Sequence, residues 1–367
     1  MTGPVSRFAL ITALGLALAA CDDPQPAKPP AAPTTKAVEK APQQVPLVPA
    51  PAAAVSASPL AQAFDGARFD PAATDPAAKT QALVRLQVLL DRAHFSPGVI
   101  DGQEGTNLKI AIQAFQASRN LPADGVLSAQ LWETITAGDN GPALTDYLIT
   151  EADAAGPFVT DIPTNDYEAM AKLPALSYST ALEALAERFH MDEALLQSLN
   201  PGVDFAKAGT TILVAAVGPD TLDRKVARIE IDKALGQVRA FDDKDVELAV
   251  YPATVGSTER PAPVGEWAVN TVAPRPTYTY DPSRLTFGKP KAKLTIKAGP
   301  NNPVGSTWID LTKDTYGIHG TPDPKLVNKR ASHGCVRLTN WDAAELGAAV
   351  KKGAKVVFLG AERAKGA

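Results

Sequence analysis

A histidine and a cysteine lie sixteen residues apart in the C-terminal part of the chain, each flanked by glycine. His319 occurs in Tyr316-Gly317-Ile318-His319-Gly320-Thr321-Pro322, and Cys335 in Ser332-His333-Gly334-Cys335-Val336-Arg337. A thiol attacks only as thiolate, so a catalytic cysteine needs a basic or positive neighbour, most often an imidazole. Gly334 permits close backbone approach, so the amides of Gly334 and Cys335 are candidates for binding a developing oxyanion. The pattern predicts nucleophilic catalysis by Cys335.

Two other interpretations of these residues remain open. The first is a buried thiol with two core histidines, although dense glycine around polar residues makes a poor core. The second is a metal site formed by His319, His333 and Cys335, since histidine and cysteine in threes are typical zinc ligands. The His-Gly-Cys sequence places two of these ligands only two residues apart, which is not a recognised metal-site spacing. We therefore favour catalysis.

The segments around these residues alternate as β-strands do. Branched or alternating runs at 227–231, 238–241, 247–250 and 267–270 predict strands. A helix is expected from Trp341 to about Lys351, with Asn340 as its N-cap and with Lys351 and Lys352 in its last turn, as the helix dipole prefers. Gly353 is expected to end this helix before a final strand at 355–359. The C-terminal region is thus predicted to be β-rich, with one late helix.

Several motifs together resemble the L,D-transpeptidase catalytic domain, the YkuD family. They are the Ile318-His319-Gly320-Thr321-Pro322 and Ser332-His333-Gly334-Cys335-Val336-Arg337-Leu338 segments, preceded by Val264-Gly265-Glu266-Trp267, Gly299-Pro300-Asn301-Asn302-Pro303-Val304-Gly305 and Trp308-Ile309. The resemblance covers residues 226–360. It implies a β-rich, sandwich-like fold with mixed sheets.

The resemblance also implies roles for individual residues. Cys335 is expected to be the nucleophile and His319 the general base, with the Gly320 carbonyl orienting the imidazole. His333 and Gly334 complete the expected catalytic group. Arg337, Ser332 and Thr321 are expected on the substrate side. Arg337 would bind a substrate carboxylate, and the Ser332 hydroxyl would fix the loop through a local bond.

The implied reaction is a two-step acyl transfer that needs no metal or organic cofactor. The cysteine attacks the L,D peptide bond after the third residue of a tetrapeptide stem and passes the acyl group to an amine. A second stem as acceptor would give a 3→3 cross-link, which is the expected outcome. A lipoprotein lysine would give covalent anchoring, a free D-amino acid would give exchange, and water would give hydrolysis. A wall-binding lipoprotein with an idle catalytic domain is the alternative from another class.

Upstream, residues 78–140 are expected to form a three-helix unit. Apolar stripes at Leu83, Leu86 and Leu90 and at Leu108, Ile112 and Phe115 predict two helices, and Ser128 is the expected N-cap of a third. Two Asp-Gly turns echo one another as a weak internal repeat. Leu89-Leu90, Gly98-Val99-Ile100-Asp101-Gly102, Ala114-Phe115-Gln116 and Asp124-Gly125-Val126 resemble the peptidoglycan-binding domain type 1, which implies peptidoglycan as a partner.

Residues 165–218 are expected to form a small α/β unit. Two predicted helices, the Asn200-Pro201-Gly202 stop and a strand at 210–214 resemble a divergent LysM module, which implies binding of the peptidoglycan glycan. Tyr178 and Phe189 are the candidate glycan-stacking aromatics. A connector that packs against the catalytic domain is an equally good interpretation.

The N-terminus has the features of an export signal. Arg7 is followed by an apolar stretch too short to span a bilayer, and Leu18-Ala19-Ala20-Cys21 resembles a lipoprotein box, with residues 1–20 as the signal. Lipidated Cys21 would attach the protein to a membrane, with its folded part in the periplasm. Asp22 favours the inner membrane as the site of attachment. Residues 21–77, rich in alanine and proline, are expected to be a disordered linker.

Composition supports a multidomain α+β protein outside the nucleic-acid-binding classes. The 367 residues include 45% hydrophobic side chains, enough for at least one core, and the formal charge is −4. Such a charge provides no basic field for a polyanion, so nucleic acid is excluded as an expected partner.

Overall fold

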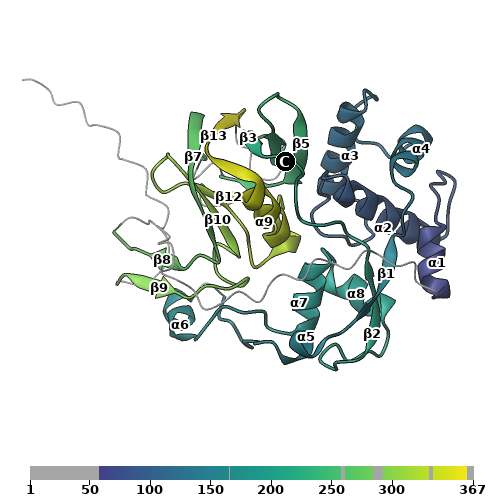
Figure 1. Ribbon diagram of the computed structural model, residues 1–367, viewed down its shortest axis with the longest axis horizontal. Helices are drawn as coiled ribbons and strands as arrows, with labels where there is room; N and C mark the ends of the chain where they lie inside the picture. Colours follow the sequence, from purple (N-terminus) through teal and green to yellow (C-terminus); the bar gives the residue numbers. More distant parts are fainter. Residues whose placement is uncertain (1–57, 165, 258–260, 284–291, 330–333, 362–367) are drawn as a thin grey trace, which may run out of the picture. The chain divides into compact units, whose positions relative to one another are not determined.

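The computed structural model describes residues 58–164, 166–257, 261–283, 292–329 and 334–361 (Figure 1). Helical segments predominate up to about residue 200, and strands predominate after it. No helix in these ranges combines the length and the hydrophobicity that a bilayer crossing requires.

The predicted three-helix unit is present as α2 (Pro76–Arg92), α3 (Thr106–Ser118) and α4 (Ala129–Gly138). Ser128 caps α4 by accepting a hydrogen bond from the Leu131 amide, as predicted. The bundle has an apolar core of its own, in which Leu86, Leu90 and Phe115 are buried. The helix expectations for this region are therefore confirmed.

The weak repeat seen in the sequence corresponds to a repeated hydrogen-bond pattern. Gln87 Oε1 accepts from the Gly102 amide at 2.8 Å, and Gln87 Nε2 donates to Asp101 at 2.9 Å. One helix later, Gln116 makes the same pair of bonds with Gly125 and Asp124, at 2.8 and 2.9 Å. Each Asp-Gly turn is thus held by a glutamine of the preceding helix.

Part of the expected linker is folded. Helix α1 (Pro59–Asp65) lies within the 21–77 range, and its Ala61 and Phe64 are buried in a core that also contains Val84 and Val88 of α2. The prediction of disorder up to residue 77 is therefore wrong from residue 59 onwards. The alanine- and proline-rich composition concealed a short helix whose few apolar side chains pack against the bundle.

The next unit contains β1 (Leu144–Leu148), α5 (Glu151–Ala155), α6 (Tyr167–Lys172), α7 (Ala181–Arg188), α8 (Glu193–Leu199) and β2 (Thr211–Ala215). Strands β1 and β2 pair antiparallel, with Leu144 opposite Ala215. The predicted closing strand corresponds to β2, and its partner β1 lies before residue 165. The predicted range of 165–218 therefore left one strand of this unit out. Phe189, a candidate glycan-stacking residue, is buried in the core of this unit, which removes it from an exposed binding face.

The described C-terminal strands form one nine-stranded mixed sheet and a separate two-stranded pair, which agrees with the expected β-rich domain of mixed sheets. The order in the large sheet is β5-β4-β3-β13-β7-β10-β11-β12-β6, and β8 pairs with β9. The strand bounds are β3 (Val226–Asp232), β4 (Gln237–Phe241), β5 (Glu247–Pro252), β6 (Thr254–Val255), β7 (Gly265–Pro274), β8 (Tyr278–Tyr280), β9 (Leu294–Ile296), β10 (Thr307–Leu311), β11 (Gly317–His319), β12 (Val336–Arg337) and β13 (Val350–Leu359). The four predicted strands coincide with β3, β4, β5 and β7.

Helix α9 (Asn340–Ala349) is the predicted late helix, but both of its ends differ from the expectation. Thr339 is the N-cap, since its hydroxyl accepts from the Asp342 amide at 3.1 Å. The helix stops at Ala349, and Lys351, Lys352 and Gly353 lie in β13. The charge of the lysines suits a helical last turn, but Val350 already pairs with Val226 and residues 355–359 continue the pairing with β3, so Lys351 and Lys352 lie in an irregular stretch of β13 between these pairs.

Candidate active site

The two segments that carry the predicted chemistry are neighbouring parallel strands. In the register of β11 and β12, Ile318 lies opposite Val336 and His319 opposite Arg337. Ile318 and Val336 are both buried in the main core of the sheet. Because side chains alternate along a strand, His319, Arg337 and Cys335, which directly precedes β12, belong to the other face. The sheet thus brings together residues that are sixteen to eighteen positions apart.

The imidazole of His319 is fixed by its own loop. Its Nδ1 lies 2.7 Å from the carbonyl oxygen of Gly320, which can only accept, so Nδ1 carries the proton and Nε2 has the free lone pair. The Trp308 ring stacks on the imidazole, with ring centroids 5.4 Å apart and an interplanar angle of 21°. The expected orienting role of Gly320 agrees with this geometry.

Burial keeps both reacting groups neutral. Burial, together with the positive charge of Arg337, lowers the pKa of His319 to about 3, against the opposing effect of the bond to Gly320. Burial likewise raises the pKa of the Cys335 thiol to about 11, although a backbone bond from Gly317 and the Arg337 charge act in the opposite direction. The resting pair is therefore a thiol and a neutral imidazole, and the proton transfer belongs to the reaction itself.

The thiol lies beside a strained backbone segment. Cys335 Sγ is 4.0 Å from the carbonyl oxygen of Thr315, to which the thiol donates. Thr315 is a buried β-branched residue with a φ of 71°, in the left-handed region that such residues rarely occupy. Gly334, next to Cys335, has a φ of 115°, a conformation that requires glycine. The sequence signalled Gly334 but gave no sign of Thr315.

An aromatic wall and a guanidinium complete the described part of the site. Tyr167 of α6 stacks on Tyr280 with centroids 5.1 Å apart and also faces Tyr278 at 5.6 Å. Cys335 packs against the same apolar cluster. Burial raises the pKa of Tyr167, and the Arg337 charge lowers it, so the guanidinium acts on this wall as well as on His319. Among the described residues, the buried Nε of Arg337 has no hydrogen-bond partner.

The remaining predicted site residues are placed as follows. Ser332, His333 and Cys21 lie outside the described residues. Thr321 is buried, and its hydroxyl accepts from the Asp323 amide at 3.3 Å, a bond that closes the local turn. The zinc interpretation depends on His333. Within the described ranges, no group of three histidine, cysteine or acidic side chains is placed to hold a metal ion.

Asn340 is a contributor to the site that sequence reasoning treated only as a helix cap. Its Oδ1 accepts from the Ser306 amide at 3.0 Å. A Cβ on Gly305 or on Gly320 would overlap with this oxygen, so both glycines make room for it beside the loop that holds His319. Both glycines belong to the motifs found in the sequence. Their contact with Asn340 could not be predicted, because no local pattern distinguishes an asparagine that holds a loop from one that caps a helix.

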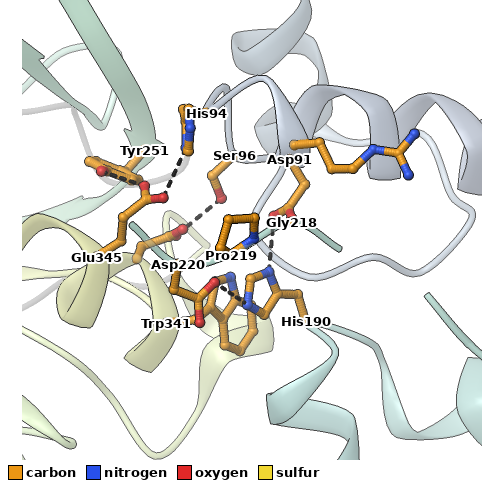
Figure 2. A pocket seen from close by; sticks show the side chains of 12 residues that line it. Asp91, His94, Ser96, His190, Gly218, Pro219, Asp220, Tyr251, Trp341 and Glu345 are labelled. Atoms are coloured by element: carbon orange, nitrogen blue, oxygen red, sulfur yellow. Dashed lines mark hydrogen bonds and ion pairs between the residues drawn. The ribbon is translucent and has the colours of Figure 1, made fainter. Parts of the chain in front are cut away.

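A second polar cluster, which we call the junction cluster, lines a small pocket between α2, β5, α9 and the loop after α7 (Figure 2). It contains Asp91, His94, Ser96, His190, Asp220, Tyr251, Trp341, Asp342 and Glu345. His190 lies between two carboxylates, with Nδ1 3.0 Å from Asp91 and Nε2 3.1 Å from Asp220. Its ring stacks on Trp341 at a centroid distance of 4.9 Å. Ser96 donates to Asp342 at 3.1 Å, which joins the helical bundle to α9.

Comparisons with known proteins match two separate segments. Residues 226–358 match the model of the YkuD family, described as the L,D-transpeptidase catalytic domain. Residues 79–135 match the model of the "Putative peptidoglycan binding domain". The chain therefore carries a peptidoglycan-binding domain ahead of a transpeptidase domain.

Curated relatives carry the name of the same family. The chain is 28% identical over 178 residues to the "Putative L,D-transpeptidase YkuD" of Bacillus licheniformis, covering 48% of this chain and 91% of the relative. It is 31% identical over 134 residues to the "Putative L,D-transpeptidase YqjB" of Bacillus subtilis, covering 35% of this chain and 68% of the relative. A solved L,D-transpeptidase from Mycobacterium smegmatis matches at 19% identity and a TM-score of 0.30, covering 41% of this chain and 64% of that one. The chain belongs to the YkuD family of L,D-transpeptidases.

Proposed function

We propose that this protein forms 3→3 cross-links in peptidoglycan, with Cys335 as nucleophile and His319 as general base. The observation that carries the proposal is the parallel pairing of β11 and β12, which places His319, Arg337 and Cys335 on one face of the sheet. The fixed tautomer of His319 leaves Nε2 as the proton acceptor. Among the described residues, Cys335 is also the only cysteine, and it forms no disulfide.

The two half-reactions follow from these groups. Cys335 Sγ attacks the carbonyl carbon of the third stem residue, while its proton passes to His319 Nε2. The C–N bond then breaks, and the terminal D-alanine leaves with that proton, so a thioester remains on Cys335. An amine of a second stem attacks the thioester, returns a proton through His319, and regenerates the thiol. Because the resting pair is neutral, substrate binding has to precede thiolate formation.

Arg337 is proposed to bind a carboxylate of the stem peptide. A guanidinium binds carboxylates through paired, charge-assisted hydrogen bonds. The buried Nε of Arg337 has no hydrogen-bond partner among the described residues, and an unpaired buried donor lowers stability. A substrate carboxylate would accept a hydrogen bond from it. The charge of Arg337 also favours the thiolate that forms during the reaction.

The proposal extends to where the enzyme works. We infer that the chain is exported to the periplasm, lipidated at Cys21 and held on the inner membrane, as Asp22 favours. The residues 21–57 would then serve as a tether, since proline-rich chain extends about 3.1 Å per residue. The sequence of the N-terminus and the peptidoglycan-binding domain that follows it support this inferred location. Labelling with a radioactive fatty acid tests lipidation, and a Cys21→Ala variant that still incorporates label would refute it.

Purified protein incubated with disaccharide tetrapeptides tests the activity. We expect a dimer whose mass equals two substrates minus one D-alanine, and no dimer with Cys335→Ala. Unchanged substrate with the wild type, or a fully active Cys335→Ala, would overturn the proposal. A tripeptide product would instead indicate hydrolysis, and a product only in the presence of a lipoprotein would indicate anchoring. Loss of activity with a chelator, together with bound zinc, would support the metal interpretation.

A further inference from the structure

Helix α7, which lies outside the segment matched by the catalytic family, is bonded directly to the catalytic region. Glu187 of α7 accepts from Asn340 Nδ2, with Oε2 at 2.9 Å and Oε1 at 3.3 Å. Both side chains are buried, at 7% and 5% exposure. The other acceptor near Asn340 Nδ2 is the Pro300 carbonyl, at 3.3 Å. Glu187 is thus the main partner of this amide group.

The opposite end of Asn340 touches the backbone that orients the base. Its Oδ1 accepts from the Ser306 amide and lies against Gly305 and Gly320. The Gly320 carbonyl in turn accepts from His319 Nδ1 at 2.7 Å. Since an amide group is planar and rigid, the partner of Nδ2 also fixes the position of Oδ1. A continuous set of contacts therefore runs from Glu187 through Asn340 to Gly320 and His319.

We propose that Glu187 is a positioning residue for the transpeptidase reaction, which acts through Asn340 to hold the Gly320 carbonyl and thereby His319. The proposal rests on the proposed catalytic role of His319. It assigns helix α7 a part in the chemistry, in addition to any part in binding the wall.

The contacts of Glu187 distinguish this role from simple attachment of the helix. Glu183, one turn earlier on α7, also faces the catalytic domain, where it accepts from Asn301 Nδ2 at 2.8 Å, and it accepts from the Ser179 amide just before its own helix at 2.6 Å. Within the described part of the chain, the hydrogen bonds of Glu183 do not include Asn340. The two glutamates therefore form a matched pair on one helix face, since both attach α7 and only Glu187 reaches the residue beside Gly320.

The test compares Glu187→Ala, Glu187→Gln and Glu183→Ala in the full chain, with tetrapeptide substrates and with melting temperatures measured in parallel. Loss of the acceptor leaves a buried amide unpaired, so we expect kcat of Glu187→Ala to fall about tenfold with KM little changed. Glutamine keeps an acceptor for Asn340, so Glu187→Gln should retain kcat within about twofold. Glu183→Ala should retain kcat as well.

Two further measurements separate positioning from folding. Asn340→Ala removes the contact from the catalytic side without altering α7, so it tests the same path if Glu187→Ala is unstable. The double variant should lose no more kcat than Asn340→Ala alone, because Asn340→Ala already removes the residue through which Glu187 acts. The ¹⁵N shifts of His319 should report a weakened Nδ1–H bond in Glu187→Ala and a native one in Glu187→Gln.

Three results would overturn the proposal in an enzyme whose wild type is active and whose Cys335→Ala variant is not. They are a wild-type kcat for Glu187→Ala, an equal loss in Glu183→Ala, and no rescue by Glu187→Gln. An inactive wild type would count against the proposed function instead.

Discussion

The active site and the junction cluster both bury ionisable side chains, but they treat charge in opposite ways. At the active site, desolvation by burial has the largest effect on the pKa values of His319 and Cys335 and favours the neutral form of each, while the nearby charge of Arg337 has a smaller effect. At the junction, burial also opposes the charge of His190, but the carboxylates of Asp91 and Asp220 outweigh it and raise its pKa well above the ordinary value. The same residue type is thus prepared for proton transfer in one place and for an ion pair in the other.

This contrast teaches that a perturbed pKa in a pocket does not by itself locate the chemistry. The junction cluster has the pocket and the dense set of shifted groups, among them Asp342, whose pKa burial raises to about 8. Its side chains are nevertheless directed at one another across three segments of the fold (Figure 2). We infer that this cluster stabilises the packing of the segments. Mutations of paired residues in the two regions test the distinction.

The largest effect is expected from His319→Asn. Removal of a general base costs about 10²–10⁴ in rate, so cross-linking should fall by that factor. The melting temperature should change little, because the contacts of His319 with the described residues are to the Gly320 carbonyl and the Trp308 ring and include no ion pair. Product formation by mass spectrometry and thermal unfolding measure the two quantities. Turnover equal to that of the wild type would show that His319 is not the base.

His190→Asn should give the reverse result. Asparagine tolerates the left-handed backbone of His190, whose φ is 56°, so the change removes mainly the imidazolium between two carboxylates. Loss of one partner of a buried ion pair costs about 3 kcal/mol or more of stability. Urea unfolding should therefore show a lower midpoint, with kcat at low temperature retained. A stable variant with lost activity would place the junction cluster in the chemistry.

The pH dependence of thiol alkylation tests the neutral state of the active site. Since the pKa of Cys335 is raised to about 11, its alkylation by iodoacetamide should accelerate about tenfold per pH unit from pH 7 to pH 10. Peptide mass mapping isolates the Cys335 peptide, and unfolded protein gives the reference rate. A rate already at its plateau near pH 6 would instead reveal a preformed thiolate–imidazolium pair.

The smallest effect concerns the pH dependence of stability. Burial raises the pKa of Asp342 and that of Glu187 to about 8, above their ordinary values of 3.8 and 4.5, so the folded state binds protons that the unfolded chain has released. The contribution of these two groups to folding stability is therefore fully present below about pH 4 and is lost as the pH rises through 8. The raised pKa of His190 acts in the same direction from its ordinary value of 6.5 upwards.

Asp342→Asn should therefore flatten the decline of the melting temperature between pH 5 and pH 9. Asp243→Asn, at an exposed position, serves as the matched control and should leave the decline unchanged. If Asp342→Asn showed the wild-type slope, the carboxyl would not be protonated in the folded state near neutral pH.

Local sequence patterns predicted many of the elements, and they failed where long-range pairing decided the structure. The helical stripes and the Ser128 cap predicted the bundle, and alternating runs predicted β3, β4, β5 and β7. The predicted end of α9 was wrong because Lys351 and Lys352 suit a helix C-terminus locally, whereas the pairing of Val350 and of residues 355–359 with β3 draws the stretch between them into a strand. Helix α1 was missed because its stability comes from contacts made by Ala61 and Phe64.

For the candidate active site, the motifs and the resemblance to the YkuD family predicted that His319, Gly320, Gly334, Cys335 and Arg337 form one group. The parallel register of β11 and β12 and the stacking of Trp308 were decided by the sheet, which joins strands that no sequence spacing pairs. Asn340 and Glu187 are 153 residues apart and gave no local signal.

The sequence by itself determined the family of this protein, because the proposed nucleophile, the proposed base and their flanking glycines, which belong to its motifs, are encoded within twenty consecutive residues. Tertiary structure alone decided which histidine is neutral and which is charged. Their ionisation depends on burial and on carboxylates that come from distant segments, as Asp91 and Asp220 do around His190.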